Sequence, residues 1–183
     1  MGVQLILEAA DPREVGARLA SLGLGPLPIW IVRAGPSGDR LVVEAAESAP
    51  QAPLELADPL VAIGWATVEL DRAAANFGGG FEQAPDDELL GAFARIRRPI
   101  VILEPSTEGR LVATLVRHSE GPAAIYIGAP GGDLEAGVAR AVERGAGFSR
   151  AATGPLGPSA LMLGGPTWGP HVILVGSATI GTP

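Results

Sequence analysis

PIVILEPSTEGRLVATLVRHSEGPAAIYIGAPGGDLEAGVARAVERGAGF, residues 99–148, is the stretch of sequence around which the fold is organised. The apolar runs at residues 100–103 and 123–128 are predicted to be strands, because each is short and is bounded by glycine or proline. Asp133 follows the second run and precedes a helical pattern that Gly145 stops, which is typical of an N-cap and a C-terminal glycine. The two strands therefore flank a junction between similar halves of the chain.

The composition excludes several classes of protein. The 20 acidic and 13 basic residues give a net charge of −7, and the basic residues are scattered, so nucleic acid is not an expected partner. The chain has no cysteine, which excludes disulfides, thiolate metal sites and cysteine nucleophiles. No signal peptide is evident, and no apolar run approaches the ~20 residues that a membrane helix needs. We therefore expect a soluble cytoplasmic protein that engages no membrane.

Turn signals and apolar periodicity divide the chain into four segments. Both later segments have the same order of elements: a strand, then a helix with an aspartate at its start, then further strands. The first segment repeats this order least completely. The expected segments are an N-terminal βαββ module at residues 1–47, a proline-rich linker at residues 48–59, and two similar modules at residues 60–120 and 121–183.

Within these segments the pattern predicts individual elements. A helix should begin at Pro12, and a second, short helix should be capped by Asp71 and end at the glycines 78–80. The acidic residues 82–88 are interpreted as a solvated loop. The expected strands cover residues 3–7, 27–32, 40–44, 63–70, 89–97, 100–103, 123–128, 159–163 and 171–175.

Four motifs follow one another along the chain, and their order and spacing are more specific than any one of them alone. They are Trp65-Ala-Thr-Val-Glu-Leu-Asp-Arg-Ala-Ala, Ile100-Val-Ile-Leu-Glu-Pro, His118-Ser-Glu-Gly-Pro-Ala-Ala-Ile-Tyr-Ile before Asp133-Leu-Glu-Ala, and His171-Val-Ile-Leu-Val. With them, residues from about 61 to 178 resemble the vicinal oxygen chelate superfamily of glyoxalases, methylmalonyl-CoA epimerases, extradiol dioxygenases and bleomycin-resistance proteins. The resemblance implies an α+β fold in which paired βαβββ modules form a cup-shaped, mostly antiparallel sheet around a small molecule. Residues 1–47 are expected to pack on this sheet.

The metal site of the superfamily is not reproduced in this sequence. In metal-dependent members, a histidine on the first strand of each module and a carboxylate on the last strand of each hold a divalent ion. The resemblance places Gly64 and Ala124 at the histidine positions, and Val101 and Ile173 at the carboxylate positions. None of these side chains offers a donor atom to a metal. We therefore expect no metal and no other cofactor, and the resemblance does not carry over the activities of the enzymes.

Side chains alternate between the two faces of a strand, so residues an even number of positions away from these four on the same strand share their face. We expect these residues, like the four positions themselves, to face the cup. We call this the parity argument. This predicts a mostly apolar cup in which Val101, Leu103, Ala124 and Ile173 contact the ligand. His171 and Tyr126 supply one imidazole and one phenol. His171 is interpreted either as a proton donor or acceptor near neutral pH or as a strand-end histidine in solvent.

Other candidate ligand contacts lie near the expected rim. Trp65 and Trp168 could stack on a ligand ring or belong to the core. Arg97, with its neighbours Arg95 and Arg98, could hold a ligand carboxylate or form a solvated strand edge. Arg97 is taken as the ligand-binding arginine.

The predicted cup is compatible with two functions. The first is a metal-free protein that binds a small, partly apolar or aromatic molecule. The alternative is a metal-independent isomerase, cyclase or lyase that uses His171 and Tyr126 for proton transfer. The sequence does not decide between binding and catalysis, and a homodimer also stays open.

Overall fold

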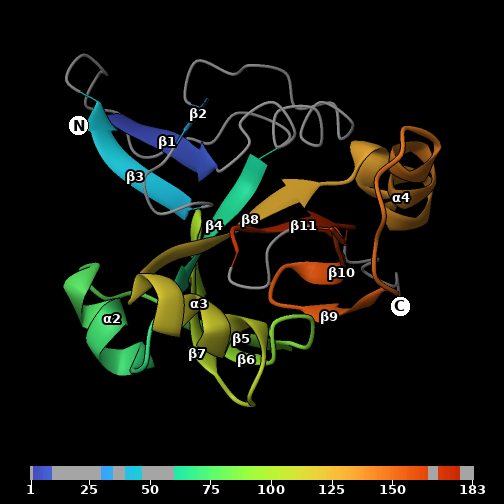
Figure 1. Ribbon diagram of the computed structural model, residues 1–183. Coiled ribbons are helices and arrows are strands. Elements are labelled where there is room, and N and C mark those ends of the chain that lie inside the picture. The colour runs from blue at the N-terminus through green and yellow to red at the C-terminus, as the bar shows by residue number, and fades with distance from the viewer. Residues whose placement is uncertain (1, 10–29, 35–39, 47–59, 165–168, 178–183) are drawn as a thin grey trace.

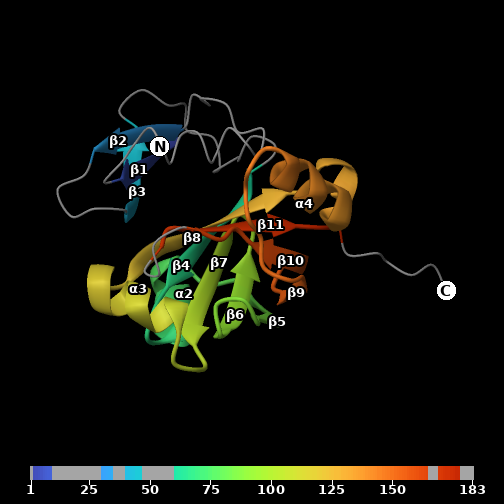
Figure 2. The same ribbon diagram turned by 45° about the vertical axis from the view of Figure 1, so that its right-hand side comes forward.

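The computed structural model describes two β-sheets (Figures 1 and 2). A three-stranded sheet has the order β2-β1-β3, and an eight-stranded sheet has the order β5-β6-β7-β4-β8-β11-β10-β9. The described residues are 2–9, 30–34, 40–46, 60–164 and 169–177.

The eight-stranded sheet is built from two halves that repeat one arrangement. The first half consists of β4 (Leu60–Ala66), α2 (Leu70–Asn76), β5 (Glu82–Asp87), β6 (Ala92–Arg97) and β7 (Ile100–Pro105). The second consists of β8 (Gly121–Gly128), the 3-10 turn η1 (Pro130–Gly132), α4 (Leu134–Glu143), β9 (Ala152–Gly154), β10 (Gly157–Leu161) and β11 (His171–Val175). Helix α3 (Arg110–His118) connects the halves. No described helix is long and apolar enough to cross a membrane.

The strand pairing confirms the paired βαβββ modules. In each module the first strand pairs in parallel with the last one, as β4 does with β7 and β8 with β11, while the remaining pairs are antiparallel. The two modules join where β4 and β8 pair antiparallel. The result is a mostly antiparallel sheet of the predicted α+β class.

The two edges of this sheet come together, so that the sheet is nearly a closed barrel. The backbone N–H of Glu88 donates to the carbonyl of Thr153 at 3.1 Å, and the N–H of Thr153 donates to Oε2 of Glu88 at 3.0 Å. We call this junction between the ends of β5 and β9 the seam. The cup is the concave interior of the curled sheet.

Helix α3 covers one end of the cup, although the sequence predicted no element in this connection. Leu111 and Thr114 of α3 are buried, and Leu111 belongs to the main hydrophobic cluster of the cup. The buried members of this cluster are mostly alanine and branched aliphatic residues, which pack against one another inside the curled sheet. The cup is therefore a packed core at this end.

Three local expectations were wrong. The strand expected at residues 63–70 is β4, which ends at Ala66, and α2 begins at Leu70. The N-cap of α2 is Glu69 and not Asp71; Oε2 of Glu104 on β7 accepts a hydrogen bond from the N–H of Leu70 at 2.8 Å. The acidic segment expected to be a loop is mostly the strand β5, which pairs with β6 and buries Ala84 and Asp87. Asp133, by contrast, is the predicted N-cap, and its carboxylate accepts from the N–H of Ala136.

The N-terminal strands β1 (Gly2–Ala9), β2 (Trp30–Ala34) and β3 (Arg40–Ala46) lie near the three predicted strand positions. Their sheet has β1 in the centre, parallel to β2 and antiparallel to β3. This order differs from that of both later modules, so the first segment does not repeat their topology. The helix expected from Pro12 and the linker at residues 48–59 lie outside the described residues, and the proposed domain boundaries stay a prediction.

Candidate functional site

The floor of the cup brings together the positions that the sequence assigned to it. Gly64 on β4 pairs with Val101 on β7 and with Ala124 on β8, and Ala124 pairs in turn with His171 on β11. The ligand contacts expected in the cup share one buried cluster: Val101, Leu103, Ala124, Tyr126 and Ile173. The parity argument thus identified one face of the sheet, whereas contact of these residues with a ligand stays a prediction.

The space around Gly64 is too small for a side chain. A Cβ at this position would lie 2.8 Å from Cβ of Ala124, 3.0 Å from Cδ1 of Leu103 and 3.2 Å from Cε2 of Tyr126. An imidazole at the position of Gly64 therefore has no room. The four positions that the resemblance assigned to the metal ligands carry no donor atom in their side chains, and the described residues contain no group of three His, Asp or Glu that could hold a metal ion. The cup floor does not fit a metal ion of this kind.

Tyr126 and Asp87 form a buried polar pair inside the cup. The Tyr126 hydroxyl donates to Oδ2 of Asp87 at 2.7 Å, and Oδ1 of Asp87 accepts from the N–H groups of Leu89 and Leu90 at 3.1 and 3.0 Å. Tyr126 is 0% exposed and Asp87 is 1% exposed. Burial raises the pKa of Asp87, an effect that the hydrogen bond from Tyr126 opposes, and burial also raises the pKa of Tyr126.

Sequence reasoning missed Asp87, which was assigned to a solvated acidic loop. The pair links the end of β5 in the first module to β8 in the second, across the inside of the cup. Strand parity would not have found Asp87, because the buried residues Ala84 and Asp87 lie three positions apart across a β-bulge. The pair has the residue types of a proton relay, but it lies under packed side chains.

His171 is buried at 3% exposure beneath α3 and does not lie at a strand end in solvent. Its Nε2 is 3.0 Å from Oγ1 of Thr114, and the Thr114 hydroxyl donates to the carbonyl of Arg110 at 3.0 Å. The Thr114 oxygen is therefore free to accept a hydrogen bond from Nε2–H. Burial, with a smaller effect from the positive charge of Arg110, lowers the pKa of His171 to about 4, so the imidazole is neutral at pH 7.

The lowered pKa of His171 predicts a loss of stability in acid. The folded state favours the neutral imidazole, so its contribution is fully present above pH 6.5 and is lost as the pH falls towards 4. We expect His171→Gln to reduce the drop in unfolding free energy between pH 7 and pH 5 by about 2 kcal/mol. Urea denaturation at both pH values measures this difference.

His118→Gln is the matched control for that experiment, because His118 is the other histidine of the chain and is only half-buried. Of the two variants, His171→Gln should show the weaker dependence of stability on pH. Equal pH slopes for wild type and His171→Gln would show that His171 is accessible to protons in the folded state.

The remaining predicted contacts do not converge on the cup. Trp65 lies on the outer face, where its ring meets Phe77 edge-on at 5.0 Å. Arg97 donates to the carbonyls of Phe77 and Gly79, both at 2.6 Å, and its guanidinium lies over the Phe81 ring. These two hydrogen bonds fix the backbone of the segment that follows α2. Trp168 lies outside the described residues.

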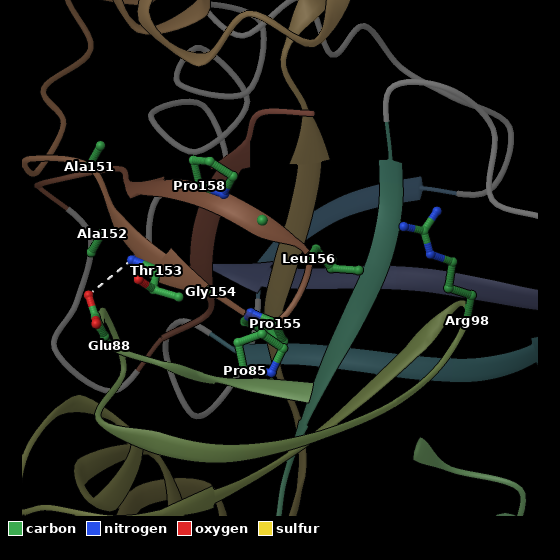
Figure 3. A pocket seen from close by; sticks show the side chains of 11 residues that line it. Pro85, Glu88, Arg98, Ala151, Ala152, Thr153, Gly154, Pro155, Leu156 and Pro158 are labelled. Atoms are coloured by element: carbon green, nitrogen blue, oxygen red, sulfur yellow. Dashed lines mark hydrogen bonds between the residues drawn. The ribbon is translucent and has the colours of Figure 1, made fainter. Parts of the chain in front are cut away.

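A cleft of about 720 Å³ lies beside the seam, and we call it the seam cleft. Figure 3 shows Glu88 and Thr153 at its left, Arg98 at its right and Leu156 between them. Leu156 belongs to the turn between β9 and β10 and packs against the cluster in the cup. The cleft is lined by Pro85, Glu88, Arg98 and residues 151–158.

Arg98 and Leu156 also line a second hollow of about 330 Å³ at the end of the sheet, together with Val61, Gly128 and Val175. Arg98 is exposed, and no hydrogen bond or ion pair joins it to a described residue. Its two neighbours in the cluster do have such partners, since Arg95 pairs with Asp71 at 2.6 Å and Arg97 donates to the carbonyl of Gly79. Of the three arginines in the sequence cluster, Arg98 is the one that lines both hollows and whose guanidinium makes no hydrogen bond or ion pair within the described part of the chain.

The arrangement of strands is also found in known structures. A methylmalonyl-CoA epimerase variant from Streptomyces coelicolor, solved with 2-nitronate-propionyl-CoA, is 22% identical over 69% of this chain and 99% of its own, with a TM-score of 0.55. The methylmalonyl-CoA epimerase from Mycobacterium tuberculosis is 18% identical over 66% of this chain and 88% of its own, with a TM-score of 0.53. A hypothetical protein from Bacillus halodurans is 18% identical over 68% of this chain and 97% of its own, also with a TM-score of 0.53.

No family profile and no curated protein sequence matches the chain. The similarity to known proteins is therefore one of structure, and it agrees with the order of motifs along the sequence. The two modules of this chain have the fold of the vicinal oxygen chelate superfamily, the superfamily of the methylmalonyl-CoA epimerases.

Proposed function

We propose that this protein binds, without a metal ion, a small molecule that carries an apolar body and an anionic group, and that the seam cleft is where it binds. The observation that supports this most is that the guanidinium of Arg98, which no described residue engages, lines the same cleft as the apolar side chain of Leu156. A guanidinium fork suits a carboxylate or phosphate. Cavities of about 300 to 1,000 Å³ with few polar groups are typical of small-molecule sites.

The wall of the seam cleft has the composition that a partly apolar ligand needs. Pro85, Pro155 and Pro158 present rigid apolar rings, and Leu156 continues the apolar surface towards the cup. The carboxylate of Glu88 is engaged by the N–H of Thr153. The neighbour from Streptomyces coelicolor was solved with 2-nitronate-propionyl-CoA, which supports small-molecule binding by this fold.

Arg98→Ala is expected to weaken the binding of small aryl and alkyl carboxylates by about tenfold, because a charge-assisted hydrogen bond is lost at an exposed site. Isothermal titration calorimetry with 4-phenylbutyrate measures the change. The neutral amide, 4-phenylbutanamide, has the same apolar body, so its affinity should change less than about twofold.

Arg117→Ala controls for the loss of one positive charge, since Arg117 is exposed on α3 and does not line the cleft. It should leave the affinity for 4-phenylbutyrate nearly unchanged. Equal losses in Arg98→Ala and Arg117→Ala would assign the effect to net charge. A carboxylate affinity that Arg98→Ala leaves unaltered would place the ligand elsewhere.

The alternative function is proton transfer by His171 and Tyr126. Each has a hydrogen-bond partner, Thr114 for His171 and Asp87 for Tyr126, which would orient a catalytic group. Neither residue lines the seam cleft or the second hollow, and both are buried. Substrate would have to displace packed side chains to reach them. For this reason binding is the function that the geometry supports better.

A further inference from the structure

A separate hollow of about 360 Å³ lies on the outer face of the sheet, beneath α2, and we call it the α2 hollow. Figures 1 and 2 both show α2 on the side of the molecule away from β9 and β10, which carry the seam cleft. The two sites share no residue. The α2 hollow is lined by Trp65, Ala73, Asn76, Phe77 and Glu120.

Two aromatic rings form the apolar wall of the α2 hollow. Trp65 and Phe77 are both half-buried, and their rings meet edge-to-face with centroids 5.0 Å apart. Both rings also line the hollow, so that part of each ring is in contact with its open space. The face of an indole is the aromatic surface that attracts cations best.

Glu120 supplies a fixed anionic group at the same hollow. Its Oε1 accepts from the Thr67 hydroxyl at 2.7 Å, from the N–H of Val68 at 2.8 Å and from Nη2 of Arg72 at 2.6 Å. Its Oε2 receives no hydrogen bond from the described residues. The hydrogen bond from Arg72, together with those from Val68 and Thr67, lowers the pKa of Glu120 to about 2, so the group is a carboxylate at any pH near neutrality.

The charges around Glu120 do not balance. Arg72 also pairs with Glu69 at 3.1 Å, so one guanidinium is shared by two carboxylates. One negative charge is thus left over beside an aromatic wall and an unused carboxylate oxygen. A flat cation that stacks on an aromatic face and also donates hydrogen bonds complements all three features.

We propose that the α2 hollow binds a small organic cation of the alkylguanidinium class. The guanidinium donates to Oε2 of Glu120 and stacks on Trp65, while the alkyl chain contacts Phe77 and Ala73. This inference is independent of the anionic ligand proposed for the seam cleft, where Arg98 repels a cation.

The test uses the ¹⁵N-labelled full chain and the probe n-butylguanidinium. The indole N–H of Trp65, identified among three tryptophans by its loss in Trp65→Phe, should shift in a saturable way, as should the amide of Asn76. n-Butylurea has the same shape without the charge and should give no saturation up to about 20 mM. Equal binding of both probes, or no saturable shift with n-butylguanidinium, overturns the proposal.

Two variants locate the contact. Glu120→Gln should weaken binding of n-butylguanidinium by about tenfold, read at the amide of Asn76, whereas Glu69→Gln should weaken it by less than about twofold. Glu69→Gln removes the same charge from the same arginine but does not line the hollow. Equal effects of the two variants overturn the assignment of Glu120. If Glu120→Gln does not fold, Trp65→Leu is the variant to test. It should weaken the binding of n-butylguanidinium by about fivefold, because the aromatic face is lost. An unchanged affinity of Trp65→Leu overturns the proposal.

Discussion

Asp87→Ala is expected to lower the free energy of unfolding by about 3 to 5 kcal/mol at pH 7. The substitution removes the acceptor of three hydrogen bonds at once, from the Tyr126 hydroxyl and from the N–H groups of Leu89 and Leu90. Each buried donor left without a partner costs about 1 to 3 kcal/mol. Urea denaturation followed by circular dichroism measures the change.

The neighbouring residue provides the control. Asp86→Ala removes a carboxylate from the same strand, but Asp86 is exposed, so its effect should stay within about 0.5 kcal/mol. Tyr126→Phe removes one of the three donors and should cost about 1 to 3 kcal/mol. In a double-mutant cycle the two changes should not add, because they share one hydrogen bond. Equal stabilities of Asp87→Ala and Asp86→Ala would mean that Asp87 is in contact with water.

Gly64→His is expected to lower the free energy of unfolding by roughly 3 kcal/mol or more, because it overpacks the floor of the cup. Its Cβ alone would lie within 3.2 Å of three atoms, from Ala124, Leu103 and Tyr126. These neighbours belong to a packed sheet and cannot all withdraw. Gly64→Ala, which adds this Cβ only, should cost about 1 to 3 kcal/mol.

Gly109→Ala is the matched control, since a Cβ at Gly109 would meet no atom within 4 Å. Its effect on stability should be small. The contrast also tests whether the cup floor could hold a metal ligand, because the sequence resemblance assigns Gly64 to the position of a histidine in metal-dependent members of the superfamily. A Gly64→His protein as stable as Gly109→Ala would show that the cup floor has room for an imidazole ligand after all.

The sequence predicted those parts of the fold that depend on local patterns. Apolar runs between glycines and prolines located β7 and β11, and Asp133 with Gly145 located α4, because capping and turn preferences act over a few residues. Strand parity then placed Tyr126 and Ile173 on the inner face. These inferences needed no knowledge of distant contacts.

Features that depend on distant partners could not be found in this way. Asp87 belongs to a cluster of acidic residues that is typical of a surface, and it is buried because Tyr126, 39 residues away, donates to it. Arg97 was chosen over Arg98, yet carbonyls of the segment after α2 engage Arg97 and leave Arg98 free. Helix α3 was missed because neither end carries a side-chain cap, although its inner face buries Leu111.

The seam has a consequence for how this protein behaves at high concentration. An open sheet ends in strands whose unpaired N–H and C=O groups can recruit a strand from another chain, which leads to fibrous aggregates. Here β5 and β9 are joined to each other at Glu88 and Thr153, so part of each edge is already occupied. Pro85 within β5 has no N–H to offer at this edge. The seam, which borders the seam cleft, therefore also hinders the addition of a strand from another chain.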